Sequence, residues 1–336
     1  PILTVRWGIA EEPLHRLVDA ADRVHWRRNQ QKEPEKLTGE ALQNYIAGRK
    51  KGAGLGLPFA AEMVRRTGVP IGLLPCAHGG TSMDQWDPAL RDQGGNSLYG
   101  ATIRRVRLVG GKVKGILWYQ GESDANPKAA PLFPQKFERL VAAFRSDFGQ
   151  PDLPFYYVQI GRHVSAANVA EWNAVQEMQR KAEAAIPRSG MAPAVDFTLD
   201  DGIHVSTQDH KRLAARLAAL ACHDAFPDNA ACAALKRGPR PVSARFDNGV
   251  VRVEFGEVNG ELRAQGRPAG FSIHAPGGEP LAAIYKVRLD GNVALLHVQG
   301  KLPDGATLWY GNGKDPYCNV RDAADMAMPV FGNLAI

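Results

Sequence analysis

Long hydrophobic runs are missing from this sequence. No stretch approaches the roughly 18 consecutive apolar residues that a membrane-spanning helix needs, so the sequence predicts no such span. Cysteine is scarce too, with four residues and no C-x-x-C spacing of the kind that holds zinc. Cys222 and Cys232 flank a polar turn and could form a disulfide in an exported protein, or remain reduced, buried thiols.

A strong charge imbalance is also lacking. The formal net charge is +6 over 336 residues, and the basic run at residues 104–107 has no aromatic residues between its arginines. A nucleic-acid groove would need a continuous basic stripe, so we expect solvated basic faces and no nucleic-acid partner. With 44% hydrophobic and 23% charged residues, the composition is that of a globular protein and excludes a disordered chain.

What is present, from about residue 57 to residue 225, is an alternation of short apolar runs and longer amphipathic ones. It predicts strands at residues 69–77, 113–119 and 153–160, and helices at 57–66, 97–109, 134–148, 168–185 and 207–222. Short strands separated by helices indicate an α/β domain with a parallel sheet.

The pattern changes near residue 228. Residues 238–330 combine alternating apolar runs with closely spaced turn signals, which predicts a small antiparallel sandwich or barrel. We therefore expect two domains, at residues 1–235 and 236–336, joined by a linker at 236–241.

Three polar segments follow expected strands, where ligands collect in parallel sheets. Gly79 and Gly80 follow the first; their backbone N–H groups could stabilise an oxyanion, or they could form only a tight turn. Gln120 and Glu122 follow the second. The Gln120 amide could donate to an oxyanion and Glu122 could orient a base or brace the loop, although a solvated loop is the simpler reading.

The third segment contains Asp201 and His204. A spacing of three residues lets a turn bring the carboxylate to the imidazole, where it would fix the tautomer and stabilise the imidazolium of a general base. The glycine-rich run at residues 52–56 suggests a dinucleotide-binding dehydrogenase instead, but it follows a basic polar segment rather than a strand.

Together the three segments resemble the sialate O-acetylesterase family of SGNH-type carbohydrate esterases. The matching residues are 69–74, Gly79-Gly80-Thr81 and Trp86, then the long string 115–125 (GILWYQGESDA), and finally Asp201-Gly202-Ile203-His204. The resemblance covers most of residues 50–222 and continues more weakly in the C-terminal part.

This resemblance implies a flavodoxin-like, three-layer α/β/α domain with a smaller β-rich C-terminal domain, and hydrolysis of acetyl esters on sugars. His204 would be the general base and Asp201 its partner, the Gly79 N–H and the Gln120 side chain would belong to the oxyanion hole, and Glu122 would be a buried brace. The substrate would be an acetylated carbohydrate, and no metal or organic cofactor is expected.

The family's nucleophile, a serine in a Gly-x-Ser-Asn block, has no counterpart here. There is no serine before Ser82, and the sequence starts at Pro1 without a methionine or a signal-peptide pattern. We expect the first strand and its serine to lie upstream of Pro1, or on a separate N-terminal fragment. Ser82 and Ser123 match blocks of the family that do not carry the nucleophile.

We therefore expect an acetylesterase acting on sialic acid. The sequence leaves its location open, and the resemblance favours a secreted or periplasmic protein. The alternatives are an enzyme similar to acetyl xylan esterases and a catalytically inactive carbohydrate-binding relative.

Overall fold

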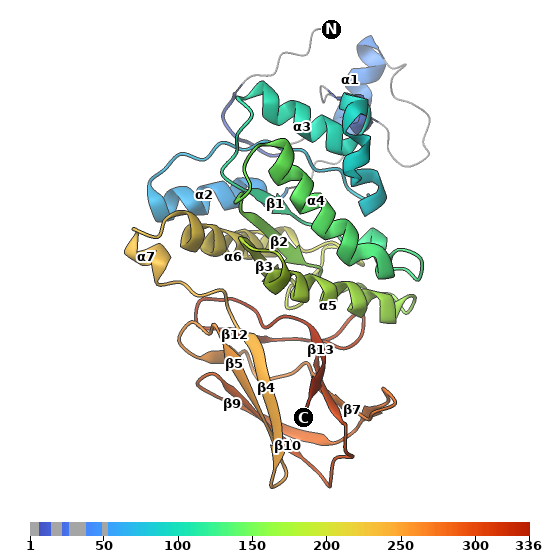
Figure 1. Ribbon diagram of the computed structural model, residues 1–336, viewed down its shortest axis with the longest axis vertical. Helices are drawn as coiled ribbons and strands as arrows, with labels where there is room; N and C mark the ends of the chain where they lie inside the picture. Colours follow the sequence, from blue (N-terminus) through green and yellow to red (C-terminus); the bar gives the residue numbers. More distant parts are fainter. Residues whose placement is uncertain (1–6, 15–21, 27–37, 49–52) are drawn as a thin grey trace.

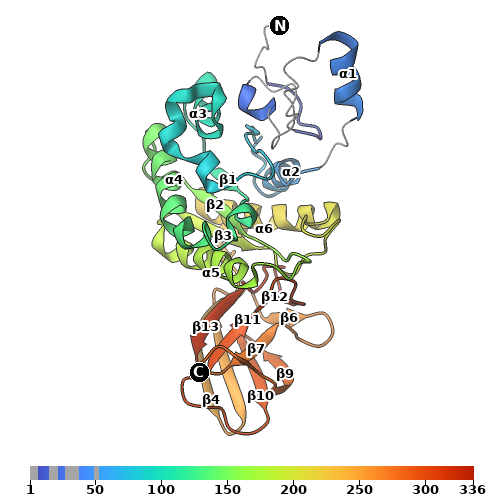
Figure 2. The same ribbon diagram turned by 90° about the vertical axis from the view of Figure 1, so that its right-hand side faces the viewer.

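The computed structural model describes residues 7–14, 22–26, 38–48 and 53–336. Gly52, which opens the glycine-rich run, lies outside these residues. Figures 1 and 2 show two regions stacked on one another: a helix-rich region around a small sheet, and a region of strands that carries the C-terminus.

The first region contains a parallel sheet in the order β1-β2-β3. Its strands are β1 (Ile116–Trp118), β2 (Phe155–Gln159) and β3 (Ser189–Pro193). Two of them fall within predicted strands, whereas β3 has no predicted counterpart. Its sequence, Ser-Gly-Met-Ala-Pro, has neither β-branched residues nor alternation, so tertiary pairing with β2 overrides a weak local preference.

Five long helices lie where the sequence predicts them, each to within three residues at either end. They are α2 (Gly56–Thr67), α3 (Leu98–Leu108), α4 (Phe133–Asp147), α5 (Val169–Ala185) and α6 (Thr207–Ala225). The shorter elements are η2 (Arg23–Trp26), α1 (Gly39–Gly48), η4 (Met83–Trp86), η5 (Pro88–Asn96), η6 (Glu122–Asp124), η7 (Ala130–Leu132) and α7 (Ala230–Ala233).

The sheet is covered by helices on both faces. Along β2, Phe155 and Tyr157 pack into a core with residues of α4 and α5, while Tyr156 and Val158 pack into a second core with residues of α2 and α6. This alternation is the consequence of side chains pointing to opposite faces along a strand. The predicted three-layer α/β/α arrangement is therefore confirmed.

The predicted strand at residues 69–77 is wrong. The segment is irregular and belongs to no β-ladder of the described chain. Its two prolines, Pro70 and Pro75, each remove an N–H donor that a ladder would use. The Pro75 carbonyl accepts a hydrogen bond from the Arg105 guanidinium instead of from a neighbouring strand.

The second region is an antiparallel sandwich, as predicted. Its main sheets have the orders β4-β5-β10-β9 and β13-β11-β7-β8, and β12 pairs with β6. The strands are β4 (Arg240–Asp247), β5 (Val250–Gly256), β6 (Leu262–Ala264), β7 (Phe271–His274), β8 (Pro280–Leu281), β9 (Ile284–Asp290), β10 (Val293–Val298), β11 (Thr307–Tyr310), β12 (Val320–Asp322) and β13 (Phe331–Ala335). One core joins both sheets, with Val253 and Leu296 from one and Ile273 and Leu308 from the other.

The two regions share buried polar contacts. The Gln159 amide at the end of β2 donates to the Val330 carbonyl (2.9 Å) and accepts from the Val330 N–H (2.8 Å). Cys222 and Cys232 are joined by a disulfide near the junction. We propose the domain boundary at residue 236, between the end of α7 and the start of β4.

No helix in the described part of the chain has both the length and the apolar character needed to cross a bilayer.

Candidate active site

Three loops leave the carboxyl ends of the parallel strands: residues 119–124 after β1, 160–168 after β2 and 194–206 after β3. Parallel strands place these ends at one edge of the sheet, where α/β proteins bind ligands. Four of the five predicted site residues lie in the first and third loops. Gly79 lies in a turn that a hydrogen bond from Gln120 to the Thr81 carbonyl connects to the first loop.

Asp201 and His204 form the predicted pair. The His204 Nδ1 lies 2.7 Å from Asp201 Oδ2, and Asp201 Oδ1 accepts hydrogen bonds from the N–H groups of Ile203 (2.9 Å) and His204 (2.8 Å). These donors, the His204 N–H foremost, hold the pKa of Asp201 well below its ordinary value. The pair lies at the surface, with 77% of the His204 side chain exposed.

Glu122 lies at the start of η6, in the loop after β1, and is half-buried. Burial raises the pKa of Glu122, and the charge on His204 partly opposes that increase, so the two side chains lie close enough to interact. A carboxyl group in this position can take a proton or attract a protonated imidazole. The predicted role of a brace near the base is compatible with this placement.

Gln120 connects two of the predicted segments. Its Nε2 donates to the Thr81 carbonyl (3.1 Å) and to Asp124 Oδ2 (2.5 Å), and the same carboxylate oxygen accepts from the Met83 N–H (2.9 Å). Asp124 is fully buried, and this burial raises its pKa. Both N–H groups of the Gln120 amide are therefore engaged within the protein, and an oxyanion would have to displace one of these partners.

Gly79 lies in an exposed turn just before Thr81. A Cβ atom at this position would meet no atom within 4 Å, so the space above the Gly79 backbone is open to a ligand. No hydrogen bond found in the described residues joins Gly79 or Gln120 directly to His204. The hydrogen bonds thus define two clusters, Thr81–Gln120–Asp124, with Gly79 in the turn just before Thr81, and Asp201–His204.

The sequence analysis missed two contributors to this edge. Asp124 belongs to the matching string, but no role is predicted for it. The only local signals are that it precedes an alanine and follows a strand that ends in a buried tryptophan. The loop after β2 is the other. There the Val164 N–H donates to the Gly202 carbonyl (2.8 Å), and the neighbouring His163 lies near Asp201, whose charge partly opposes the lowering of the His163 pKa by burial.

In the part of the chain that the structure describes, no three histidine, cysteine, aspartate or glutamate side chains are grouped so as to hold a metal ion. An aspartate–histidine pair at the strand ends of a parallel sheet lies where α/β proteins bind ligands, and the imidazole of such a pair can accept a proton.

Comparison with known proteins gives the family. Residues 3–223 match the family of carbohydrate esterases described as sialic acid-specific acetylesterases, and the chain belongs to this family. A probable carbohydrate esterase from Arabidopsis thaliana is 31% identical over 163 residues, which cover 46% of this chain and 50% of that protein. The chain thus matches only half the length of this curated relative.

A solved structure extends the similarity to both regions. A carbohydrate acetylesterase from Xanthomonas citri superposes with a TM-score of 0.69 and 25% identity, covering 91% of this chain and 70% of the other. The predicted resemblance is therefore confirmed at the level of family and fold.

Proposed function

We propose that this protein removes O-acetyl groups from carbohydrates, with O-acetylated sialic acid as the first substrate to test. The reaction is acyl transfer: a serine outside this sequence attacks the acetyl carbonyl, His204 accepts the serine proton, and Asp201 stabilises the imidazolium. Membership of a carbohydrate esterase family and the likeness to a carbohydrate acetylesterase support the ester class.

The observation that carries the proposal is the geometry of the His204–Asp201 pair. Because Nδ1 is bound to the carboxylate, the neutral imidazole carries its proton there and leaves Nε2 as the acceptor. The exposure of the ring leaves room for a nucleophile and a substrate beside Nε2.

The oxyanion donors are the second component. We assign the Gly79 N–H to this role because its turn is exposed and sterically open. Gln120 is the proposed second donor, and it contributes by exchanging its contact with Thr81 for the oxyanion while Asp124 keeps its other N–H. Glu122 remains a brace beside His204.

The nucleophile is the third component. Ser82 lies at the start of η4, where its N–H donates to Gln85 (3.0 Å), and no hydrogen bond of the described residues joins Ser82 or Ser123 to His204. In the described chain β1 pairs with β2 alone, so its other edge can accept a further strand. A strand carrying the serine at that edge would end beside the loop that holds Gln120 and Glu122.

Replacing His204 with alanine in the whole gene product tests the proposal. We expect hydrolysis of p-nitrophenyl acetate and of O-acetylated sialic acid to fall by about 10²–10⁴-fold, the usual contribution of a general base. A half-buried histidine near the C-terminal end of α6, changed in the variant His223→Ala, serves as control. Undiminished hydrolysis by the His204 variant would refute the assignment.

One observation favours a second candidate, a carbohydrate-binding protein without catalysis: no hydrogen bond in the described residues joins a serine to the His204 ring. That protein would bind acetylated glycans in a calorimeter while releasing no acetate, with or without His204.

Measured acetate release from acetyl xylan against release from acetylated sialic acid separates the two proposed substrate classes.

A further inference from the structure

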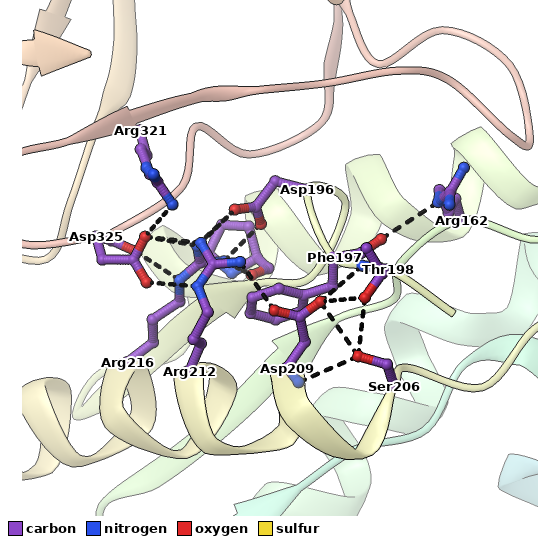
Figure 3. A network of polar contacts seen from close by, with 11 residues as sticks. Arg162, Asp196, Phe197, Thr198, Ser206, Asp209, Arg212, Arg216, Arg321 and Asp325 are labelled. Carbon is purple, nitrogen blue, oxygen red and sulfur yellow. Dashed lines mark hydrogen bonds and ion pairs between the residues drawn. The ribbon is translucent and has the colours of Figure 1, made fainter. Parts of the chain in front are cut away.

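A network of charged side chains lies beneath the loop that carries His204. Figure 3 shows Arg212 and Arg216 projecting from α6 between Asp196, Asp209 and Asp325. Asp196 and Asp209 belong to the α/β region, whereas Asp325 comes from the turn after β12 in the sandwich. The network therefore joins the sandwich to the two ends of the loop.

Asp209 holds both ends of the loop together. Its Oδ2 accepts hydrogen bonds from the Thr198 N–H (2.8 Å) and the Thr198 hydroxyl (2.6 Å), and the Ser206 hydroxyl lies 3.3 Å from the same oxygen. Thr198 precedes and Ser206 follows the hairpin closed by the Leu199–Val205 bridge. This carboxylate thus reinforces the backbone hydrogen bond from the Ser206 N–H to the Thr198 carbonyl (2.9 Å), which joins the two ends of the hairpin that carries Asp201 and His204.

Arg212 connects Asp209 to Asp325. Its Nη1 donates to Asp209 Oδ1 (2.9 Å), while Nε and Nη2 donate to the two carboxylate oxygens of Asp325 (2.9 and 2.7 Å). Such a two-point contact defines the plane of the guanidinium as well as its position. Asp325 therefore orients the donor that reaches Asp209.

Arg216 supports the start of the same loop. It is almost completely buried, binds both oxygens of Asp196 at 2.7 Å, and donates to the backbone carbonyl of Asp325 (2.6 Å). Its guanidinium also lies 4.4 Å from the ring centre of Phe197. Asp325 is itself held in place, because the Asp322 carboxylate caps its turn through the N–H groups of Ala324 and Met326.

We propose that Asp325 is a positioning residue for His204, acting through Arg212 and Asp209, so that the sandwich takes part in the reaction. This rests on the proposed function of His204. The ring is largely exposed, so side-chain packing does not orient it; the hairpin beneath it does. A misplacement of about 1 Å can cost an enzyme roughly 10²-fold in rate.

A second ion pair between the same two regions provides a matched control. Arg240 of β4 binds both carboxylate oxygens of Glu183 in α5 (2.6 and 2.9 Å), and Glu183 also accepts from the Met191 N–H (2.9 Å). This pair is connected through Met191 to β3, and no hydrogen bond of the described residues connects it directly to the hairpin. Loss of either pair weakens the contact between the regions. Of the two, only the Arg212–Asp325 pair is connected, through Asp209, to the hairpin that carries His204.

The experiment compares Asp325→Asn with Glu183→Gln in the whole gene product. Asparagine suits position 325 because its backbone φ is 62°, a left-handed conformation that asparagine tolerates. Five quantities are measured: kcat and KM for p-nitrophenyl acetate, the unfolding temperature, the Asp201 carboxyl pKa by carbon NMR, and amide exchange at Ile203 and His204.

For Asp325→Asn we expect kcat to fall about tenfold with KM within twofold, faster amide exchange in the hairpin, and an Asp201 pKa closer to its ordinary value. For Glu183→Gln we expect a lower unfolding temperature, with kcat, KM, amide exchange in the hairpin and the Asp201 pKa at wild-type values. Asp325→Asn with a wild-type kcat, exchange and Asp201 pKa would overturn the inference, whatever its unfolding temperature.

The outcome separates this inference from the proposed function. If His204→Ala abolishes hydrolysis while Asp325→Asn behaves as the wild type, only the inference fails. If His204→Ala is fully active, the proposed function fails, and the NMR and exchange measurements still decide whether Asp325 holds the hairpin.

Discussion

Replacing Asp201 with asparagine isolates the orientation of the imidazole from the folding of its loop. Asp201 accepts three hydrogen bonds: two from backbone N–H groups at Oδ1 and one from the His204 ring at Oδ2. An asparagine can retain the first two through its amide oxygen. Its NH₂ group, however, replaces the oxygen that faces His204 Nδ1, and an NH₂ group cannot accept the ring proton.

The ring must then move its proton to Nε2, the nitrogen proposed to act as the base. Loss of the correct tautomer in a triad of this kind costs about 10³–10⁴-fold in kcat, so we expect that decrease with little change in KM. Nitrogen NMR of the His204 ring gives the tautomer directly, and p-nitrophenyl acetate hydrolysis gives kcat. An Asp201→Asn variant that keeps its proton on Nδ1 and yet loses activity, or that switches tautomer and remains active, would refute this reasoning.

Three further predictions concern stability. Replacing both Cys222 and Cys232 with serine is expected to lower the free energy of unfolding by about 2–3 kcal/mol, from a closed loop of roughly ten residues; urea unfolding that is unchanged from the wild type contradicts this. Arg216→Met leaves the buried Asp196 without its two-point partner, and we expect a loss of about 3 kcal/mol in the same assay, with less than about 1 kcal/mol counting against it. For Glu122, burial raises the folded-state pKa above 4.5, so the folded protein holds the proton longer than the unfolded chain and loses stability as pH rises through the raised pKa. Glu122→Gln should therefore unfold at a higher temperature than the wild type above that pKa and at an equal temperature below pH 4.5; a constant difference across pH would contradict the sign.

Much of the fold is legible from local pattern. The helices α2 and α4 are strongly amphipathic, and each buries one stripe of residues, so their periodicity predicts their positions closely. The sandwich strands alternate exposed and buried residues, as β5 does, and closely spaced turn signals separate them. These features depend on residues near one another in the chain.

The wrong or incomplete predictions concern segments whose structure depends on residues distant in the chain. The apolar segment at residues 69–77 predicts a strand, but a strand exists only where a neighbour completes its ladder. The short β3 shows the reverse, because its pairing with β2 compensates for a sequence without strand character. Gln120 is predicted as an oxyanion donor, yet its donors are occupied by Thr81, some forty residues earlier, and by Asp124.

By itself the sequence determined the Asp201–His204 pair, since residues three apart in a turn meet through backbone geometry alone. Only the tertiary structure decided what holds that pair in place: Arg212 and Asp325 are 113 residues apart and meet because the sandwich packs against α6. Local spacing brings an acid to a base, whereas the orientation of the pair depends on contacts that form only when the two regions fold against each other.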